Sequence, residues 1–197
     1  IDYEKGTILI GEVEYPLNST EFPTIDKENP FILTEEEKEI VERLKRSFMH
    51  SPRLNEHVKL LYSKGSMYKV FNGNLLLHGC IPMEEDGSFM PITLHGKSYR
   101  GKKALDELDR LARQGYFNND PILRERGLDA MWYLWCGPAS PLFGKKKMAT
   151  FERYYIEEKE THVEEKNPYY VDREKVEWID KILADFGLDL QDAHLIN

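Results

Sequence analysis

The fold prediction depends on the stretch Asn72-Gly-Asn-Leu-Leu-Leu-His-Gly-Cys-Ile-Pro-Met83. Asn72-Gly73 predicts a tight hairpin turn, because both positions of such a turn need positive φ. The strand before the turn is expected over 66–71. The apolar run after it, Leu75–Leu77, is typical of a buried strand bounded by turn residues. His78 is therefore predicted at the end of the second strand of a hairpin, with its imidazole in a surface cleft.

Two interpretations of His78 follow from that position. A histidine at a strand end is often a partly exposed, hydrogen-bonded side chain. It can also be a metal ligand, because the strand fixes the imidazole and Gly79 lets a bound group approach the backbone. No second ligand lies at short spacing, so the spacing alone does not decide between the two.

The composition narrows the class of protein. The chain has 197 residues, enough for a domain with a core, and 41% are hydrophobic while 31% are charged. A net charge of −8 argues against a nucleic-acid partner, which needs a basic face. No apolar run or basic leader predicts a membrane span or a signal segment. Cys80 and Cys136 form no CxxC pair, so we expect reduced thiols in a cytoplasmic protein.

The two ends of the chain suggest that it was cut from a longer protein. It begins at Ile1 without an initiator Met and ends in the apolar Leu195-Ile196-Asn197. A short buried strand is predicted over 193–196, and the terminal segment 188–196 is expected to be frayed or paired with another copy.

The remaining pattern predicts a single partial domain over 1–197. Residues 1–33 read as a hairpin, with strands 7–10 and 13–16, and a loop; residues 34–65 read as a helical pair; residues 66–100 hold the central hairpins; residues 101–197 are mainly helical and end in a short strand. Thr34 and Glu37 form a predicted capping box at the start of the first helix. The apolar side chains at helical spacing in that helix are expected to form a buried face: Ile40, Val41, Leu44 and Phe48.

Aromatic residues and one helix in the second half of the chain add further expectations. The aromatic-rich run that starts at Ala130 and includes two tryptophans is predicted to lie in the core. A helix is expected over 150–156, with Phe151, Tyr154 and Tyr155 facing inward. A single amphipathic helix is expected over 172–186.

Two charged segments allow more than one interpretation. Glu84-Glu85-Asp86 lies beside the predicted site, but its flanking Gly87 and Ser88 favour a solvated turn over a ligand cluster. Lys145-Lys146-Lys147 is the densest positive cluster of an acidic chain. It is either a solvated basic patch or a contact for a phosphate group.

Several blocks of the sequence resemble one enzyme family. The segment 74–82 resembles the His-Gly block of binuclear metallophosphoesterases and, more narrowly, of class III fructose-1,6-bisphosphatases. Further blocks similar to that family are Trp132-Tyr-Leu-Trp-Cys-Gly, Ser140-Pro-Leu-Phe-Gly-Lys, Thr150-Phe-Glu-Arg-Tyr-Tyr, Glu158-Lys-Glu-Thr-His162, Lys166-Asn-Pro-Tyr-Tyr170 and His194-Leu-Ile-Asn197. The resemblance runs along nearly the whole chain.

That resemblance implies an α/β fold, a partial sandwich of the metallophosphoesterase type with short mixed strands, hairpins and amphipathic helices. It implies a parent enzyme that hydrolyses the C1 phosphate of fructose 1,6-bisphosphate to fructose 6-phosphate and phosphate in gluconeogenesis, through a binuclear manganese centre. Of the family's metal ligands, only the His-Gly imidazole maps onto this chain, at His78. An Asp-x-His, an Asp-Arg-rich and an Asn-His block would precede the chain, and a Gly-His-Thr-Pro block would follow it.

The resemblance also suggests substrate contacts. Gly79 would leave room for a phosphate near the metal, and Lys145, Lys146, Lys147 or Arg153 would meet its outer oxygens or the second phosphate. His162 and His194 match family blocks without a role. The chain on its own is expected to be inactive, because it lacks most of the ligands. Two alternatives stay open: a non-catalytic oligomerisation or regulatory module, and a metallophosphoesterase for another phosphate monoester.

Overall fold

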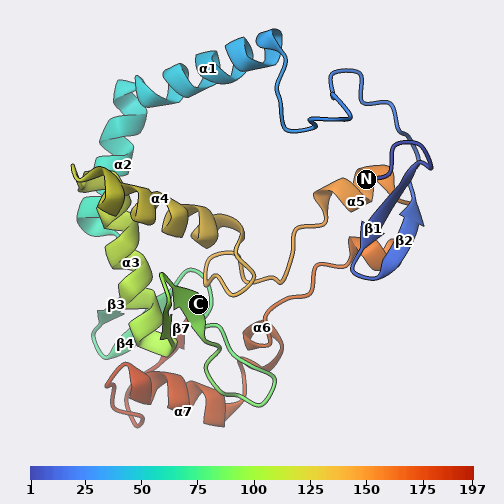
Figure 1. Ribbon diagram of the computed structural model, residues 1–197. Helices are drawn as coiled ribbons and strands as arrows, with labels where there is room; N and C mark the ends of the chain where they lie inside the picture. The colour runs from blue at the N-terminus through green and yellow to red at the C-terminus, as the bar shows by residue number, and fades with distance from the viewer. The chain divides into compact units, whose positions relative to one another are not determined.

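The computed structural model describes all 197 residues and divides them into two compact units (Figure 1). Unit 1 contains Ile1–Ser63 and Ala149–Val163, and unit 2 contains Lys64–Met148 and Glu164–Asn197. The chain has seven α-helices and short strands in three small sheets, which confirms the predicted α/β class. None of the helices combines the length and the apolar character needed to cross a bilayer. One partial domain over 1–197 stays a prediction.

Unit 1 begins with an antiparallel hairpin of β1 (Thr7–Ile10) and β2 (Val13–Pro16), as predicted. Helix α5 (Thr150–Tyr155) lies beside this hairpin in Figure 1 and is followed by the 3₁₀ helix η1 (Lys159–His162). The amide of Asn18 donates to the carbonyl of Tyr155 at 2.8 Å and joins the two distant segments. A chain of aromatic ring contacts supports this junction and contains Tyr3, Phe22, Tyr155 and Phe151.

Two consecutive helices, α1 (Glu35–Met49) and α2 (Pro52–Lys64), make up much of the rest of unit 1. The capping box is confirmed: Thr34 Oγ1 accepts from the Glu37 amide at 3.2 Å, and the Glu37 carboxylate accepts from the Thr34 amide at 2.8 Å. The predicted buried face of the first helix is wrong, because neither helix contains a buried residue. Helical spacing shows that an apolar face exists, but it does not supply the surface that would cover it.

Two further core predictions are wrong. Tyr154 in α5 is 75% exposed, and Trp132 and Trp135 in helix α4 (Pro121–Cys136) are 64% and 62% exposed. The buried face of α4 is formed instead by its small and aliphatic residues, Gly127, Ala130 and Leu134. The two tryptophans lie at other positions around the helix, where they pack edge to face on each other.

The central hairpin belongs to a three-stranded sheet in unit 2, with the order β3 (Tyr68–Phe71), β4 (Asn74–Leu77) and β7 (Leu195–Ile196). Asn72 and Gly73 have φ of 50° and 76°, which confirms the predicted turn. Strand β7 pairs in parallel with β4, and the Leu75 amide donates to the His194 carbonyl at 2.9 Å. The expectation of a frayed or intermolecular terminal strand is wrong, because β4 offers it a free edge within the chain.

Helices α3 (Gly101–Phe117) and α4 lie side by side in unit 2 (Figure 1). They approach so closely that a Cβ added to Gly127 would lie 2.1 Å from the Gly115 amide nitrogen. Asp120 is the N-cap of α4, and its carboxylate accepts from the amides of Ile122 and Leu123. A second hairpin, β5 (Ile92–Leu94) and β6 (Lys97–Tyr99), turns at His95-Gly96 and agrees with the hairpins predicted within 66–100.

The helix predicted over 172–186 is observed as α7 (Val176–Asp185): its end is confirmed, but its start is wrong by four residues. A short helix α6 (Tyr169–Asp172) is separated from α7 (Val176–Asp185) by a turn in which the Lys175 amide donates to the Asp172 carbonyl at 2.9 Å. Lys175 itself is extended and is the N-cap of α7. The amphipathic pattern continues across this turn, so periodicity alone does not reveal it.

Both hydrophobic clusters of the chain lie in unit 2. One joins β4 and the residues after it to α7, and its larger members are Leu75, Ile81, Met83, Tyr169, Trp178, Ile182 and Leu183. The other joins β5 to the α3–α4 pair and contains Ile92, Leu94, Ala104, Leu108, Leu111, Ala130 and Leu134. The strand that leads to His78 is thus anchored in a packed core.

Candidate functional site

His78 lies at the end of the central strand of the three-stranded sheet, directly after β4 ends at Leu77. Strand β7 runs parallel to β4, so Asn197 follows β7 at the same end of the sheet. The carboxyl ends of neighbouring parallel strands are a common location for ligand sites. The His78 side chain is exposed there, and its predicted place at a strand end is confirmed. Its predicted place in a cleft stays a prediction, because neither cavity described below contains it.

The backbone after His78 is held from two sides. The Asn197 side-chain amide donates to the Gly79 carbonyl, and the Cys80 amide donates to the Pro141 carbonyl at 2.8 Å. A Cβ added to Gly79 would lie 2.1 Å from that same Pro141 oxygen. Only glycine allows this approach. A role for Gly79 in substrate binding stays a prediction, and the space beside its Cα is filled by Pro141.

The loop that contains Pro141 is itself fixed by a buried serine. Ser140 Oγ donates to the Leu134 carbonyl at 2.6 Å and accepts from the amides of Leu142 and Phe143 at 3.2 Å each. Ser140 is only 1% exposed, so these bonds satisfy a polar group that would otherwise be costly to bury. The loop ties the end of α4 to the His78-Gly79 turn.

Cys80 is no candidate nucleophile. Its side chain is 1% exposed, and burial raises the pKa of its thiol to about 12, although a hydrogen bond with Tyr170 acts in the opposite direction. The thiolate is the reactive form of cysteine, so this thiol is inert at neutral pH. A Cys-His catalytic pair with His78 has no support in this geometry.

Metal-ligating side chains do not cluster in this chain. Nowhere in residues 1–197 do three or more His, Cys, Asp or Glu side chains gather as a metal site requires. His78 therefore has no co-ligands here, and the residues present do not fit a binuclear manganese centre. The acidic turn contributes none: Glu85 and Asp86 are exposed and line an open cavity of about 380 Å³ with Met90 and Lys146.

The lysine cluster is paired with glutamates on an antiparallel neighbouring segment. Lys145 Nζ lies 2.6 Å from Glu164 Oε2, and Lys146 Nζ lies 2.5 Å from Glu165 Oε1. The hydrogen bond with Glu165 raises the pKa of Lys146. A phosphate would have to compete with these carboxylates. Phosphate contacts by Lys145, Lys146 or Lys147 stay predictions.

Arg153, the last predicted contact, belongs to unit 1, whereas His78, Gly79 and the three lysines belong to unit 2. Its guanidinium is exposed and donates to the His162 carbonyl at 3.4 Å. His162 in turn has its Nε2 2.9 Å from the Ile156 carbonyl, a local contact within unit 1. A substrate contact by Arg153 also stays a prediction.

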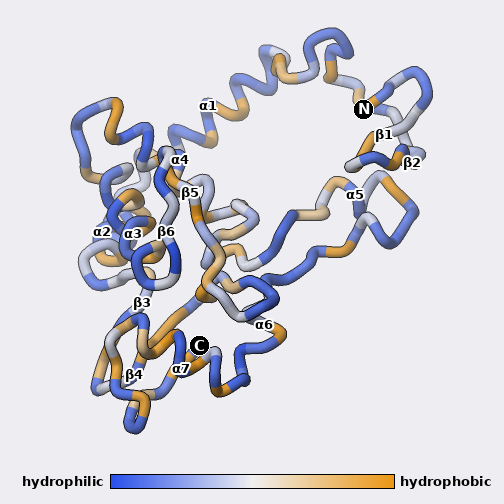
Figure 2. Tube along the Cα trace, turned by 60° about the horizontal axis from the view of Figure 1, so that its bottom comes forward, coloured by the Kyte–Doolittle hydropathy of each residue, from blue (hydrophilic) through white to orange (hydrophobic).

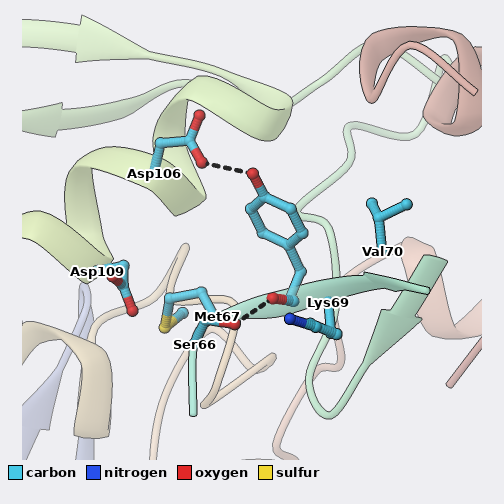
Figure 3. A pocket seen from close by; sticks show the side chains of 7 residues that line it. Ser66, Met67, Lys69, Val70, Asp106 and Asp109 are labelled. Carbon is cyan, nitrogen blue, oxygen red and sulfur yellow. Dashed lines mark hydrogen bonds between the residues drawn. The ribbon is translucent and has the colours of Figure 1, made fainter. Parts of the chain in front are cut away.

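A second cavity, of about 330 Å³, lies between β3 and α3 and contains none of the predicted site residues (Figure 3). Its carboxylates are already satisfied. Asp106 accepts from the Tyr68 hydroxyl at 2.8 Å and from Lys102 Nζ at 2.6 Å, and Asp109 pairs with Arg113 at 2.6 Å. These bonds stabilise the junction of strand and helix and leave neither carboxylate unpaired.

Sequence reasoning missed three residues that shape the site. Asn197, Ser140 and Pro141 contact the His78-Gly79 turn or the loop against it. All three lie in two blocks already noted for their resemblance, Ser140-Pro141 in one and the terminal Asn197 in the other, but no spacing rule connects either block to residue 78. The role of Asn197 depends on parallel pairing between strands more than one hundred residues apart in sequence, and that of Ser140 and Pro141 on a loop contact with Cys80.

Comparison with known proteins identifies the family. A protein-family model described as Firmicute fructose-1,6-bisphosphatase matches residues 1–197. The chain belongs to the Firmicute fructose-1,6-bisphosphatase family. It is 52% identical to a fructose-1,6-bisphosphatase class 3 of Clostridium botulinum strain Loch Maree and 50% identical to that of strain Alaska E43, each over 198 residues.

These alignments cover 100% of this chain but 30% of the length of each relative. The chain thus spans less than a third of the curated members of the Firmicute fructose-1,6-bisphosphatase family that it matches. No solved structure matches it. Family membership and the missing co-ligands of His78 are consistent with each other, because most of a relative's length lies outside the matched segment.

Proposed function

We propose that this chain acts as part of a fructose-1,6-bisphosphatase that hydrolyses the C1 phosphate of fructose 1,6-bisphosphate in gluconeogenesis, in the cytoplasm. The observation that carries the proposal is the match of the family over all 197 residues, at 52% identity to class 3 relatives. The position of His78 supports it: an exposed imidazole at the carboxyl end of a core strand can serve as a metal ligand.

Within that proposal, the chain's own residues supply one imidazole and its support. Strand β4 fixes the backbone before His78, and Asn197 and Pro141 hold the backbone after it. Manganese stays part of the proposal as the metal, and its other ligands would come from residues outside 1–197, since no ligand cluster exists within them. The isolated chain should therefore show no phosphatase activity.

A segment exchange tests the function directly. The matched 198-residue segment of the Clostridium botulinum relative is replaced by this chain, and release of phosphate from fructose 1,6-bisphosphate is measured with manganese present. The hybrid should be active, and the 197-residue chain alone inactive. His78→Ala in the hybrid should lower kcat/KM by about a hundredfold or more. Even substitution of a residue that only hydrogen-bonds to a metal ligand typically lowers metal affinity or activity about 10- to 100-fold. His57→Ala, an exposed helical histidine without a predicted role, is the matched control.

The outcomes separate the alternatives. A folded but inactive hybrid, or equal activity in the His78 and His57 variants, would contradict the proposal. Activity of the isolated chain would show that a complete site exists within 1–197. A panel of other phosphate monoesters, assayed with the active hybrid, decides whether the sugar bisphosphate is the preferred substrate.

A non-catalytic oligomerisation role is the second candidate. The observation that favours it is the exposed apolar face of α1, which resembles a contact surface more than a solvent face. The two roles are compatible, since one polypeptide can supply a metal ligand from unit 2 and a contact surface from unit 1.

A further inference from the structure

The Tyr169 side chain buries a hydroxyl that has no hydrogen-bond partner. Tyr169 is the first residue of α6 and is 0% exposed. Its hydroxyl is one of two buried side-chain polar atoms of the chain that lack a partner. An unpaired buried hydroxyl costs free energy, because it gives up its bonds with water and gains none in return. Such a group in a folded protein requires an explanation.

The position of Tyr169 is fixed by its surroundings. Its amide donates to Asn167 Oδ1 at 3.0 Å, and the same oxygen accepts from the Met83 amide at 3.0 Å. The ring packs edge to face on Tyr170, with 5.4 Å between the centroids, and belongs to the hydrophobic cluster of β4 and α7. The hydroxyl therefore cannot reach solvent unless the ring leaves the core.

Asn197 lies beside this hydroxyl. Strand β7 ends at Ile196, and the end of the chain lies near α6 in both views (Figure 1, Figure 2). Burial raises the pKa of Tyr169 to about 12, and an interaction with the Asn197 side chain acts in the opposite direction. That interaction requires the carboxamide and the phenol to lie close together.

The Asn197 carboxamide can bind on two sides. Its Nδ2 donates to the Gly79 carbonyl. A carboxamide also has an oxygen that accepts hydrogen bonds, on the other branch of the same planar group. A hydroxyl that donates to this oxygen keeps the amide directed at Gly79, because the two branches of the planar group turn together.

We propose that Tyr169 and Asn197 are positioning residues for His78. The Tyr169 hydroxyl donates to Asn197 Oδ1, the Asn197 amide donates to the Gly79 carbonyl, and this clasp fixes the backbone that carries the imidazole. The proposal rests on the proposed function, because it assumes that His78 acts in the enzyme. Neither residue needs to touch the substrate, since a displacement of about 1 Å at a functional group can lower a rate about a hundredfold.

The test uses the hybrid with the Clostridium botulinum relative. Asn197→Leu removes both hydrogen bonds of the clasp at similar side-chain size and should lower kcat about tenfold with KM unchanged. Tyr169→Phe removes only the hydroxyl and should lower kcat about threefold. The double variant should be no slower than Asn197→Leu alone, because the two side chains act as one unit.

Tyr68→Phe is the matched control. It removes a hydroxyl that donates to Asp106 at 2.8 Å, away from the turn, and should lower the unfolding temperature while kcat stays unchanged. Hydrogen exchange followed by mass spectrometry gives a second measurement that does not need activity. Exchange of the segment 79–83 should become faster in Asn197→Leu and Tyr169→Phe, whereas exchange of α3 should not change.

Three results would overturn the proposal while His78→Ala still abolishes activity, so that the proposed function stands. The first is unchanged kcat and exchange in Asn197→Leu. The second is a Tyr169→Phe variant that is fully active and more stable, because removal of an unpaired buried hydroxyl relieves its cost. The third is an equal loss of kcat in Tyr68→Phe, which would be an effect of stability alone.

Two further outcomes are decided in advance. Tyr169→Phe keeps the ring in the core, so it tests the clasp even if Asn197→Leu fails to fold. A folded hybrid that is inactive, or that is unaffected by His78→Ala, contradicts the proposed function and the positioning role with it.

Discussion

Units 1 and 2 both contain an amphipathic helix, but the apolar face is buried in α3 of unit 2 and exposed in α1 of unit 1. In α3 of unit 2, Leu105, Leu108 and Leu111 recur at helical spacing and are at most 1% exposed. In α1 of unit 1, Ile40 and Leu44 recur at the same kind of spacing and are about half exposed. Helix α3 is covered by α4 and the second hairpin, whereas α1 has no buried residue at all.

The difference shows what an amphipathic pattern can establish. It identifies a face that favours an apolar environment, because burial of apolar area is the main driving force of packing. It does not say which element, or which molecule, provides that environment. In unit 2 the cover comes from the same unit, whereas in unit 1 the apolar face of α1 contains no buried residue.

The largest effect is expected when one leucine in each unit is replaced by alanine. Leu108→Ala should lower the free energy of unfolding by about 2–5 kcal/mol, because it removes a fully buried side chain and leaves a cavity. Leu44→Ala, measured at concentrations where the chain is monomeric, should change it by about 0.5 kcal/mol or less. Urea unfolding followed by circular dichroism gives both values.

Equal losses from the two substitutions would contradict the contrast, because they would mean that Leu44 is covered within the chain. A concentration-dependent loss in Leu44→Ala alone would instead agree with a second copy on that face.

Local features of the fold were predictable from the sequence. The turns at Asn72-Gly73 and His95-Gly96 have the positive φ values that their residues favour. The caps at Thr34 and Asp120 form the hydrogen bonds that their side chains predict. Each depends on residues within four positions of one another, so local propensity decides it.

Features that depend on distant segments were not predictable in the same way. The pairing of β7 with β4 joins Leu75 to Leu195 and brings Asn197 to the His78-Gly79 turn. The exposure of Trp132 depends on α3, which covers the opposite side of α4 at Gly127. For the site, sequence located His78 correctly at a strand end, but Asn197 and Pro141 became visible only through tertiary contacts.

A smaller effect is expected when one glycine in each unit is replaced by alanine. Gly79→Ala should cost about 1–3 kcal/mol, because the new methyl group would meet the Pro141 backbone, which cannot move without disturbing the Ser140 bonds. Gly11→Ala should cost about 1–2 kcal/mol for a different reason. It has open space around it, but its φ is +64°.

Asparagine separates the two causes, because it tolerates left-handed backbone better than alanine does. Gly11→Asn should recover part of the loss, whereas Gly79→Asn should be as unstable as Gly79→Ala or worse. Recovery by Gly79→Asn would show that backbone strain, and not the approach of Pro141, requires glycine in the site. Circular dichroism during urea unfolding measures all four variants.

The smallest predicted effect concerns one ion pair of the same i,i+3 spacing in each unit. In unit 2, the Glu107 carboxylate accepts two hydrogen bonds from Arg110, at 2.7 and 2.8 Å, and its side chain is 19% exposed. The Arg110 hydrogen bonds lower the pKa of Glu107 from its ordinary value of 4.5. In unit 1, Glu35 pairs with Lys38 at 2.6 Å, but their side chains are 89% and 49% exposed.

The sign of the pH dependence follows from the depressed pKa of Glu107. Because its folded pKa lies below its unfolded pKa, the pair contributes stability above the unfolded value, and this contribution is lost as the pH falls through the folded value. Glu107→Gln should therefore destabilise the chain by about 0.5 kcal/mol at pH 7, a value reduced by the exposure of Arg110, and the difference from wild type should vanish in acid. Glu35→Gln should show no measurable difference at either pH, because solvent screens the exposed pair. A Glu107→Gln difference that persists below the folded pKa would mean that the side chain acts through packing, and the electrostatic contrast between the units would be wrong.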